Sequence, residues 1–162
     1  MPTSTLTAFH SPDFDTLRVI ALRLALASVL GFVLGIDRER GHKTAGLRTH
    51  MLVCIGAAIF ALCPTLLGMG NDAVSRVVQG VVQGIGFLGA GAILKLSDTV
   101  EVRGLTTAAS TWLVAAIGVA SGLGLLWLAV VGTAFAWVVL VPLGRVEKRL
   151  HHQRMTGNGP TP

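Results

Sequence analysis

The chain has 162 residues, of which 52% are hydrophobic and only 13% are charged, whereas a soluble domain usually carries about 25% charged residues. Too few polar residues remain to cover a surface in water, so the composition excludes an ordinary soluble protein and predicts a surface that faces lipid. The formal net charge of +5 does not indicate nucleic acid, because the basic residues gather at the edges of apolar runs, as membrane topology requires.

The apolar runs predict an all-α integral membrane protein with about five transmembrane helices, since one span takes about 20 apolar residues. In chain order, the expected helices are 17–36, 51–69, 73–94, 105–120 and 123–143. The last two come from one long apolar block, which Ser121, Gly122 and Gly124 divide. We therefore expect one transmembrane domain (17–144), a short extracytoplasmic segment before it (1–16), and a basic cytoplasmic tail (145–162) whose end is disordered.

The basic residues predict the orientation of this bundle. Five spans place the loop at 37–48, the loop at 95–103 and the tail on one side, and these segments hold ten of the 13 Lys and Arg residues. Basic residues favour the cytoplasmic side. The N-terminus is therefore expected outside and the C-terminus in the cytoplasm.

The third expected helix is rich in glycine. Gly80 and Gly84 are four residues apart, a spacing that lets two helix backbones approach closely in a membrane. The predicted packing contacts are Gly80, Gly84, Gly86, Gly89 and Gly91. The stretch 84–89 also matches the dinucleotide pattern G-x-G-x-x-G, but that pattern has meaning only between a strand and a helix. We interpret it as helix packing, with no cofactor.

Polar residues share one face of the same helix. Arg76, Gln79, Gln83, Gly86 and Ala90 recur at helical spacing. This face is expected to be buried inside the bundle. Two interpretations stay open: the glutamines hydrogen-bond neighbouring helices, which we favour because such contacts are common, or they line a polar pathway.

Arg23 is a charge about 10 Å inside the first helix, at a rise of 1.5 Å per residue. An ionisable residue at such depth is costly and indicates function by default. The alternative is that its side chain extends to the outer surface of the membrane. Asp72 is expected at the same side, so we predict an Arg23–Asp72 ion pair that neutralises the buried charge.

The loop after the first helix is dense in ionisable groups. Its candidate residues, with one from the next cytoplasmic loop, are Asp37, Arg38, Glu39, Arg40, Arg48, His50 and Arg103. We favour a solvated helix end in which Glu39 pairs with Lys43 four residues later. A divalent cation site is the alternative, but four positive charges oppose it and the spacing matches no ligand set. No catalytic residues and no metal site are predicted.

Several stretches together resemble the MgtC/SapB family of bacterial inner-membrane proteins. The matching stretches are Gly35–Arg40, Ala45–Val53, Gly84–Ile93 and Val102–Ala109. Asp72 and Arg76 resemble the charged residues that open the family's third helix, and Arg23 resembles its first-helix arginine. Better-studied members also have a C-terminal soluble domain, so the resemblance here is to the transmembrane domain alone.

The resemblance implies a protein of the bacterial cytoplasmic membrane. The family is linked to growth in low magnesium and to virulence, and its members are thought to modulate membrane energetics, including the ATP synthase. We therefore expect a small non-enzymatic protein that binds other membrane proteins in the lipid bilayer. The alternative is a transporter or channel for Mg²⁺ or protons, formed by a homo-oligomer. No nucleic-acid partner is expected.

Overall fold

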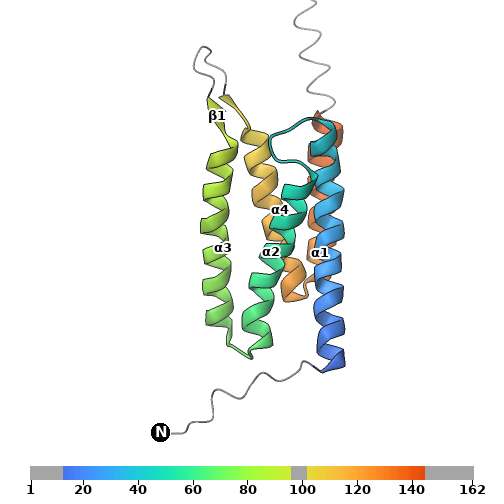
Figure 1. The fold of residues 1–162 in the computed structure, drawn as a ribbon, viewed down its shortest axis with the longest axis vertical. Coiled ribbons are helices and arrows are strands. Elements are labelled where there is room, and N and C mark those ends of the chain that lie inside the picture. Colours follow the sequence, from blue (N-terminus) through green and yellow to red (C-terminus); the bar gives the residue numbers. More distant parts are fainter. Residues whose placement is uncertain (1–12, 96–101, 145–162) are drawn as a thin grey trace, which may run out of the picture.

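The computed structural model describes residues 13–95 and 102–144. Five helices lie side by side in this part of the chain (Figure 1). They are α1 (Phe14–Arg40), α2 (Leu47–Leu66), α3 (Asn71–Ala92), α4 (Leu105–Leu123) and α5 (Leu126–Val138). The π-helical turn η1 (Val139–Leu143) continues α5. All five segments are long and apolar enough to cross a membrane. The prediction of an all-α, five-span membrane bundle is therefore confirmed.

Short connections set the ends of the bundle. The two-residue strands β1 (Leu94–Lys95) and β2 (Val102–Arg103) pair as an antiparallel hairpin between α3 and α4. Gly104 then adopts φ 97°, and a side chain there would overlap the carbonyl oxygen of Ala92. We call this the hairpin end; α1 ends and α2 begins there as well (Figure 1). At the opposite end, Gly124 with φ 81° separates α4 from α5.

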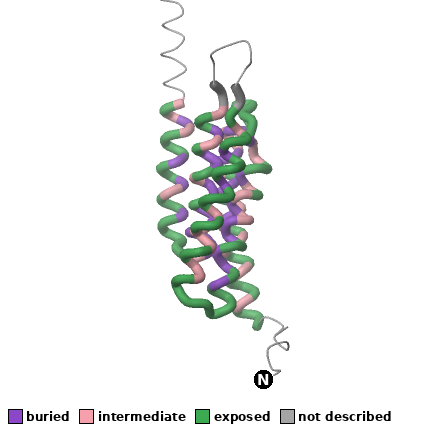
Figure 2. Tube along the Cα trace, turned by 90° about the vertical axis from the view of Figure 1, so that its left-hand side faces the viewer, coloured by how far each residue is buried: buried purple, intermediate pink, exposed green. Residues whose placement is uncertain are grey.

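Two helices form the centre of the bundle. α2 and α4 pack against each other, α1 and α5 cover one side, and α3 packs on the other side (Figure 1). The main core is built of small and branched side chains. Its members at most 2% exposed are Ala27, Leu34, Cys54, Ala58, Val114, Ala129 and Ala136. Buried residues accordingly follow the interior of the bundle (Figure 2).

α3 is the peripheral helix. Only Ile85 and Gly89 of its residues are buried. Ile85 joins Ala57 of α2 and Ala115 of α4 in a small second core cluster. The expectation that the polar and glycine face of this helix lies inside the bundle is therefore wrong for the single chain.

The close helix contacts use other glycines. A side chain at Gly31 or Gly35 of α1 would lie 2.9–3.1 Å from α2. A side chain at Gly118 or Gly122 of α4 would overlap carbonyl oxygens of α2. Glycine is required at these positions because backbone packs directly on backbone.

Among the predicted packing glycines, only Gly89 has a neighbour, the Cβ of Ala108 at 3.7 Å from a built Cβ. Nothing lies within 4 Å of a Cβ built on Gly80, Gly84, Gly86 or Gly91. The predicted packing contacts at Gly80, Gly84, Gly86 and Gly91 are therefore wrong within the single chain.

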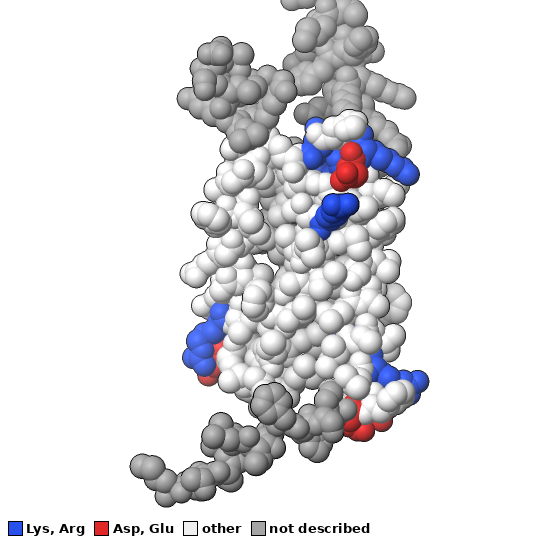
Figure 3. All heavy atoms as spheres, viewed as in Figure 1, with Lys and Arg blue, Asp and Glu red and all other residues white. Residues whose placement is uncertain are grey.

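Charged side chains gather toward the two ends of the face in Figure 3, and the band between them is uncharged. This distribution fits a bilayer-spanning molecule. The predicted orientation, N-terminus outside, stays a prediction from the basic residues. The expectations for residues 1–12 and for the tail after Gly144 lie outside the described residues.

Candidate functional site

A buried polar cluster lies at the hairpin end, between α1, α2 and α4. We call it the hairpin-end cluster, and its members are Arg38, His50, Thr107, Ser110 and Thr111. All are less than 5% exposed. The cluster forms because α1 continues through residues 37–40, which were expected in a loop. Arg38 therefore stands on the last turn of a helix and points into the bundle.

His50 is fully buried and links two helices. Its Nδ1 lies 2.9 Å from the carbonyl oxygen of Gly46, and its Nε2 lies 3.1 Å from the hydroxyl of Ser110. Nδ1–H donates to the carbonyl oxygen of Gly46. The hydroxyl of Ser110 also donates to the carbonyl oxygen of Thr107 at 2.9 Å, and Thr111 donates to the same oxygen at 2.8 Å. The ring thus ties the first turn of α2 to α4.

Arg38 is the chemically unusual member of the cluster. Its side chain is 4% exposed, and neither Nε nor Nη2 has a hydrogen-bond partner. Buried charges are normally paired, because removing a charge from water is costly. Its charge is close enough to act on the His50 ring. Within the described residues, this guanidinium makes no salt bridge, and the carboxylate whose charge favours it is that of its neighbour Asp37.

Glu39 has a structural role beside the cluster. One of its carboxylate oxygens accepts a hydrogen bond of 2.9 Å from the backbone N–H of Leu47, at the start of α2. A side chain at Gly46 would overlap that carboxylate. The predicted Glu39–Lys43 pair is therefore wrong, since the carboxylate satisfies a free helix N–H, which costs more to leave unpaired.

The other predicted loop residues are divided between surface and interior. Asp37 is half-buried, whereas Arg40 and Arg48 are exposed. Arg103 lies in β2, where its backbone pairs with Leu94; its side chain is not described. The expectation of a solvated helix end thus holds for Arg40 and Arg48 and is wrong for Arg38 and His50.

A hollow of about 310 Å³ opens beside the cluster, between the first turn of α2, the end of α3, and α4. Thr44, Thr49 and Thr111 contribute hydroxyl groups to its lining. Because Thr111 belongs to both, the hollow reaches the edge of the hairpin-end cluster.

Arg23 pairs with a helix end instead of an acid. Its Nη1 donates a 2.7 Å hydrogen bond to the carbonyl oxygen of Gly122, in the last turn of α4. Terminal carbonyls lack partners within the helix and carry the negative end of its dipole, so a cation there is favourable. In the described part of the chain, the one ion pair is Asp15–Arg18. The predicted Arg23–Asp72 pair is therefore wrong, and Asp72 is exposed.

We predict that changes at Arg23 and Asp72 act independently. Arg23→Gln should lower the free energy of unfolding by about 1–3 kcal/mol, because the Gly122 carbonyl loses its charged donor. Asp72→Asn should change it by less than about 0.5 kcal/mol, as is usual for a surface change. Thermal unfolding of the single and double variants in detergent measures both effects, with the exposed Arg18→Gln as control. A coupling free energy above about 0.5 kcal/mol between the two changes would show instead that Arg23 and Asp72 form an ion pair.

The polar residues of α3 all point away from the bundle. Asp72, Arg76, Gln79 and Gln83 are exposed. The Gln79 amide lies 3.5 Å from the hydroxyl of Ser75 on its own helix. Neither glutamine bonds a neighbouring described helix, so the favoured interpretation of interhelical contacts within one chain is wrong.

Comparison with known proteins assigns the chain to a family. The model of the MgtC family matches residues 24–149, which include α2, α3, α4, α5 and most of α1. The chain belongs to the MgtC family. With five helices able to span a membrane, it is a multi-pass membrane protein of that family, and the resemblance found in the sequence is confirmed.

Individual relatives agree with this assignment. The chain is 42% identical to protein SrpB of Synechococcus elongatus, over 80% of this chain and 77% of SrpB. It is 44% identical to protein MgtC of Brucella abortus over 82% of this chain, and 37% identical to protein MgtC of Salmonella typhimurium over 85%. It spans only 54% and 58% of those two relatives. No solved structure matches the chain.

Proposed function

We propose that this MgtC-family protein is a non-enzymatic protein of the bacterial cytoplasmic membrane that serves adaptation to low magnesium by binding other membrane proteins. The link to magnesium comes from the family. The mode of action is supported by one structural observation, an apolar groove between α2 and α3 that no part of the described chain fills.

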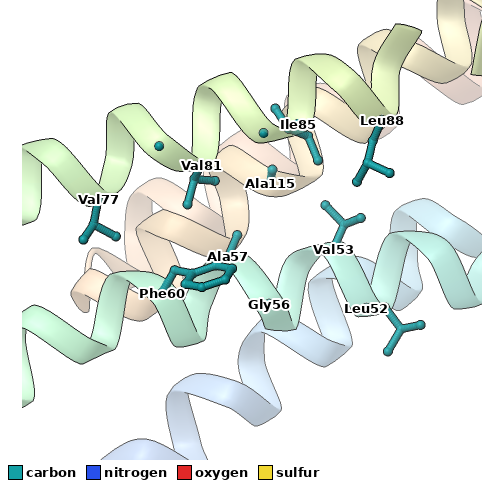
Figure 4. Close-up of a pocket in the computed structure, with 12 residues that line it drawn as sticks. Leu52, Val53, Gly56, Ala57, Phe60, Val77, Val81, Ile85, Leu88 and Ala115 are labelled. Atoms are coloured by element: carbon teal, nitrogen blue, oxygen red, sulfur yellow. The ribbon is translucent and has the colours of Figure 1, made fainter. Parts of the chain in front are cut away.

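The groove has a volume of about 660 Å³ and is lined only by apolar side chains and glycine. Val77, Val81 and Leu88 of α3 face it from one wall, and Phe60 and Val53 of α2 from the other (Figure 4). Its floor and rim include glycines whose backbone is accessible, since nothing lies within 4 Å of a Cβ built on Gly56, Gly80 or Gly84. Such a surface has the shape and polarity that accept another helix.

The occupant we propose is a transmembrane helix of a partner protein. The lining residues run from 52 to 60 on α2 and from 77 to 88 on α3, which is roughly 12–16 Å along each helix axis at 1.5 Å per residue. That length corresponds to two or three helical turns. A rigid helix can approach the glycine-lined wall closely and make more van der Waals contacts with it than mobile lipid chains can.

Filling the groove should abolish function without unfolding the protein. Gly84→Leu adds a side chain where nothing lies within 4 Å, so thermal stability should equal that of the wild type within about 0.5 kcal/mol. Growth in low magnesium, in a bacterium that depends on this chain, should be lost. Ala134→Leu is the matched control, because Ala134 is exposed on α5 and the added bulk there should leave growth unchanged.

A photo-crosslinking residue at Val81 identifies the occupant. It should form one protein adduct of defined mass in wild-type membranes, and Gly84→Leu should abolish that adduct. The ATP synthase is the first partner to test, by measuring ATP-driven proton pumping in membrane vesicles with and without the protein. Normal growth of the Gly84→Leu strain, or crosslinks to lipid alone, would contradict the proposal.

Transport is the second candidate, favoured by one observation. The exposed polar residues Arg76, Gln79 and Gln83 of α3 would line a pathway only if copies of the chain enclosed it. Purified wild-type protein in liposomes distinguishes the two functions. Saturable Mg²⁺ or proton flux from this protein alone would establish a transporter, and its absence alongside restored growth would support the modulator.

A further inference from the structure

α3 combines two properties that oppose each other in a membrane. Its most apolar stretch has the lowest mean hydropathy of the five spans, yet only 6% of that stretch is buried. The span with the next lowest hydropathy, α4, is 61% buried. Polar residues in hydrocarbon are costly, so the least apolar helix should be the best covered. A single copy of the bundle therefore leaves the wrong helix facing lipid.

The polar residues of α3 form a continuous exposed line. We call it the α3 stripe, and it consists of Asp72, Arg76, Gln79, Gln83, Gly86 and Ala90, all of them exposed. Their spacing of three or four residues puts them on one helix face. The half-buried Val74 and Val81 and the buried Ile85 lie on the opposite face. The stripe therefore points straight away from the bundle, and the α2/α3 groove lies to one side of it.

Exposing the two glutamines of the stripe to lipid costs free energy. Gln79 and Gln83 lie about 12 and 18 Å from the start of a 22-residue helix, taking 1.5 Å per residue, which places them near the middle of the span. Water does not reach that depth, and an amide there needs a protein partner. Neither glutamine finds one on another described helix. A protein surface outside the described chain must therefore cover the stripe.

The geometry points to a second copy of this chain as that surface, and we propose that two copies pack through the α3 stripe around a twofold axis along the membrane normal. Copies in one membrane share one orientation, so their α3 helices run parallel and equivalent residues meet at equal depth. A glutamine amide carries both donors and an acceptor. Each glutamine can therefore bond its equivalent in the second copy.

The charged residues of the α3 stripe in one copy complement those of the same stripe in a second copy. Asp72 and Arg76 lie one turn apart and both are exposed. In a parallel helix pair, oppositely charged residues that flank the contact can bridge the two chains. Asp72 of each copy can thus reach Arg76 of the other, giving two symmetric ion pairs. Gly86 and Ala90 lack bulk, and this permits the close backbone approach that membrane helix pairs use.

This inference goes beyond the proposed function, because it concerns another face of α3 and a different partner. Gly84 lines the groove and is absent from the stripe. Gly84→Leu should therefore leave the pair of copies intact while it abolishes growth in low magnesium. Failure of one proposal leaves the other testable.

The oligomeric state of the full chain in liposomes tests the inference. Fluorescence energy transfer between labelled copies, measured while lipid dilutes the protein, gives the dissociation constant. Gln79→Leu with Gln83→Leu should raise that constant by about 10- to 100-fold, because the interhelical hydrogen bonds are lost. The variant should stay folded, since these side chains contact no neighbouring described helix. The matched control Val130→Leu, on the exposed face of α5, should change nothing.

A charge exchange provides a rescue test. Asp72→Arg alone should weaken association, because each copy then presents two cations. Asp72→Arg combined with Arg76→Asp should restore it, because the symmetric pairs form again with reversed sign. In a background with Cys63→Ser, Gln83→Cys should form a disulfide between copies on oxidation, and Ala134→Cys should not. Cys54 can be retained because it is buried.

Three results would overturn the inference. The first is a wild-type protein that stays monomeric at every protein-to-lipid ratio. The second is association that persists at full strength in the Gln79→Leu/Gln83→Leu variant, which would place the contact elsewhere. The third is a trimer or larger ring, which is incompatible with a twofold pair.

Discussion

Gly118→Leu should prevent the protein from folding to a stable bundle, whereas Gly84→Leu should not. A Cβ at Gly118 would overlap the carbonyl oxygen of Cys54 and lie 2.9 Å from the Cβ of Ala57, both on α2. The clash involves backbone of a central helix, which cannot move aside as a side chain can. We expect a loss of about 3 kcal/mol or more, the upper end for overpacked cores.

The measurement is thermal unfolding in detergent together with the yield of monodisperse protein. The matched control is Gly84→Leu, the same change at a glycine of the same four-residue spacing but with open space around it. Gly118→Ala should already be measurable, because the overlap begins at Cβ. Equal stability of the Gly118 and Gly84 variants would mean that α2 and α4 do not pack backbone to backbone.

The difference between Gly118 and Gly84 explains why glycine spacing alone predicts the wrong helix contacts. Three helices carry glycines four residues apart: Gly31 and Gly35 in α1, Gly80 and Gly84 in α3, and Gly118 and Gly122 in α4. The first and last pairs pack on α2, and the α3 pair faces open space. The spacing predicts that a helix can be approached closely. It does not tell which helix approaches, because that depends on which spans share the centre of the bundle.

The fold class followed from the sequence because it depends on a sum over many residues. Five apolar runs of sufficient length permit few other structures in a membrane. Helix ends were harder, since charged residues can continue a helix past the hydrocarbon boundary. Asp37 to Arg40 are charged, yet they form the last turn of α1. That extra turn is what brings Arg38 into the interior.

The candidate site was located only in part. Arg38 and His50 stand out in the sequence for their charge, but the partner of His50 is Ser110, which is 60 residues further along the chain. The sequence indicates that Arg23 is unusual, but the predicted partner Asp72 is wrong. The actual partner is a backbone carbonyl, which every residue has and no sequence pattern singles out. An exposed acid such as Asp72 draws attention as a partner, whereas the end of a helix supplies the same charge without any acidic residue.

Arg38→Met should stabilise the protein or leave its stability unchanged, and should still abolish growth in low magnesium. Arg38 is 4% exposed, and its Nε and Nη2 are buried without a partner. Replacing a buried charge that lacks hydrogen-bond partners by an apolar side chain of similar length removes the cost of keeping that charge out of water. A residue that the fold holds at such a cost is expected to serve function, since strain and unpaired charge are typically kept at functional sites.

The control is Arg40→Met, two residues along the same helix, where the side chain is exposed. It should change neither stability by more than about 0.5 kcal/mol nor growth. His50→Phe tests a member of the cluster that is held by hydrogen bonds. It removes the link to Ser110 and should destabilise the protein by about 1–3 kcal/mol, because polar groups of α2 and α4 lose their partner. If Arg38→Met is instead less stable than the wild type by more than about 1 kcal/mol, the guanidinium is compensated in the folded protein, and its role in the hairpin-end cluster is to hold α1 in place.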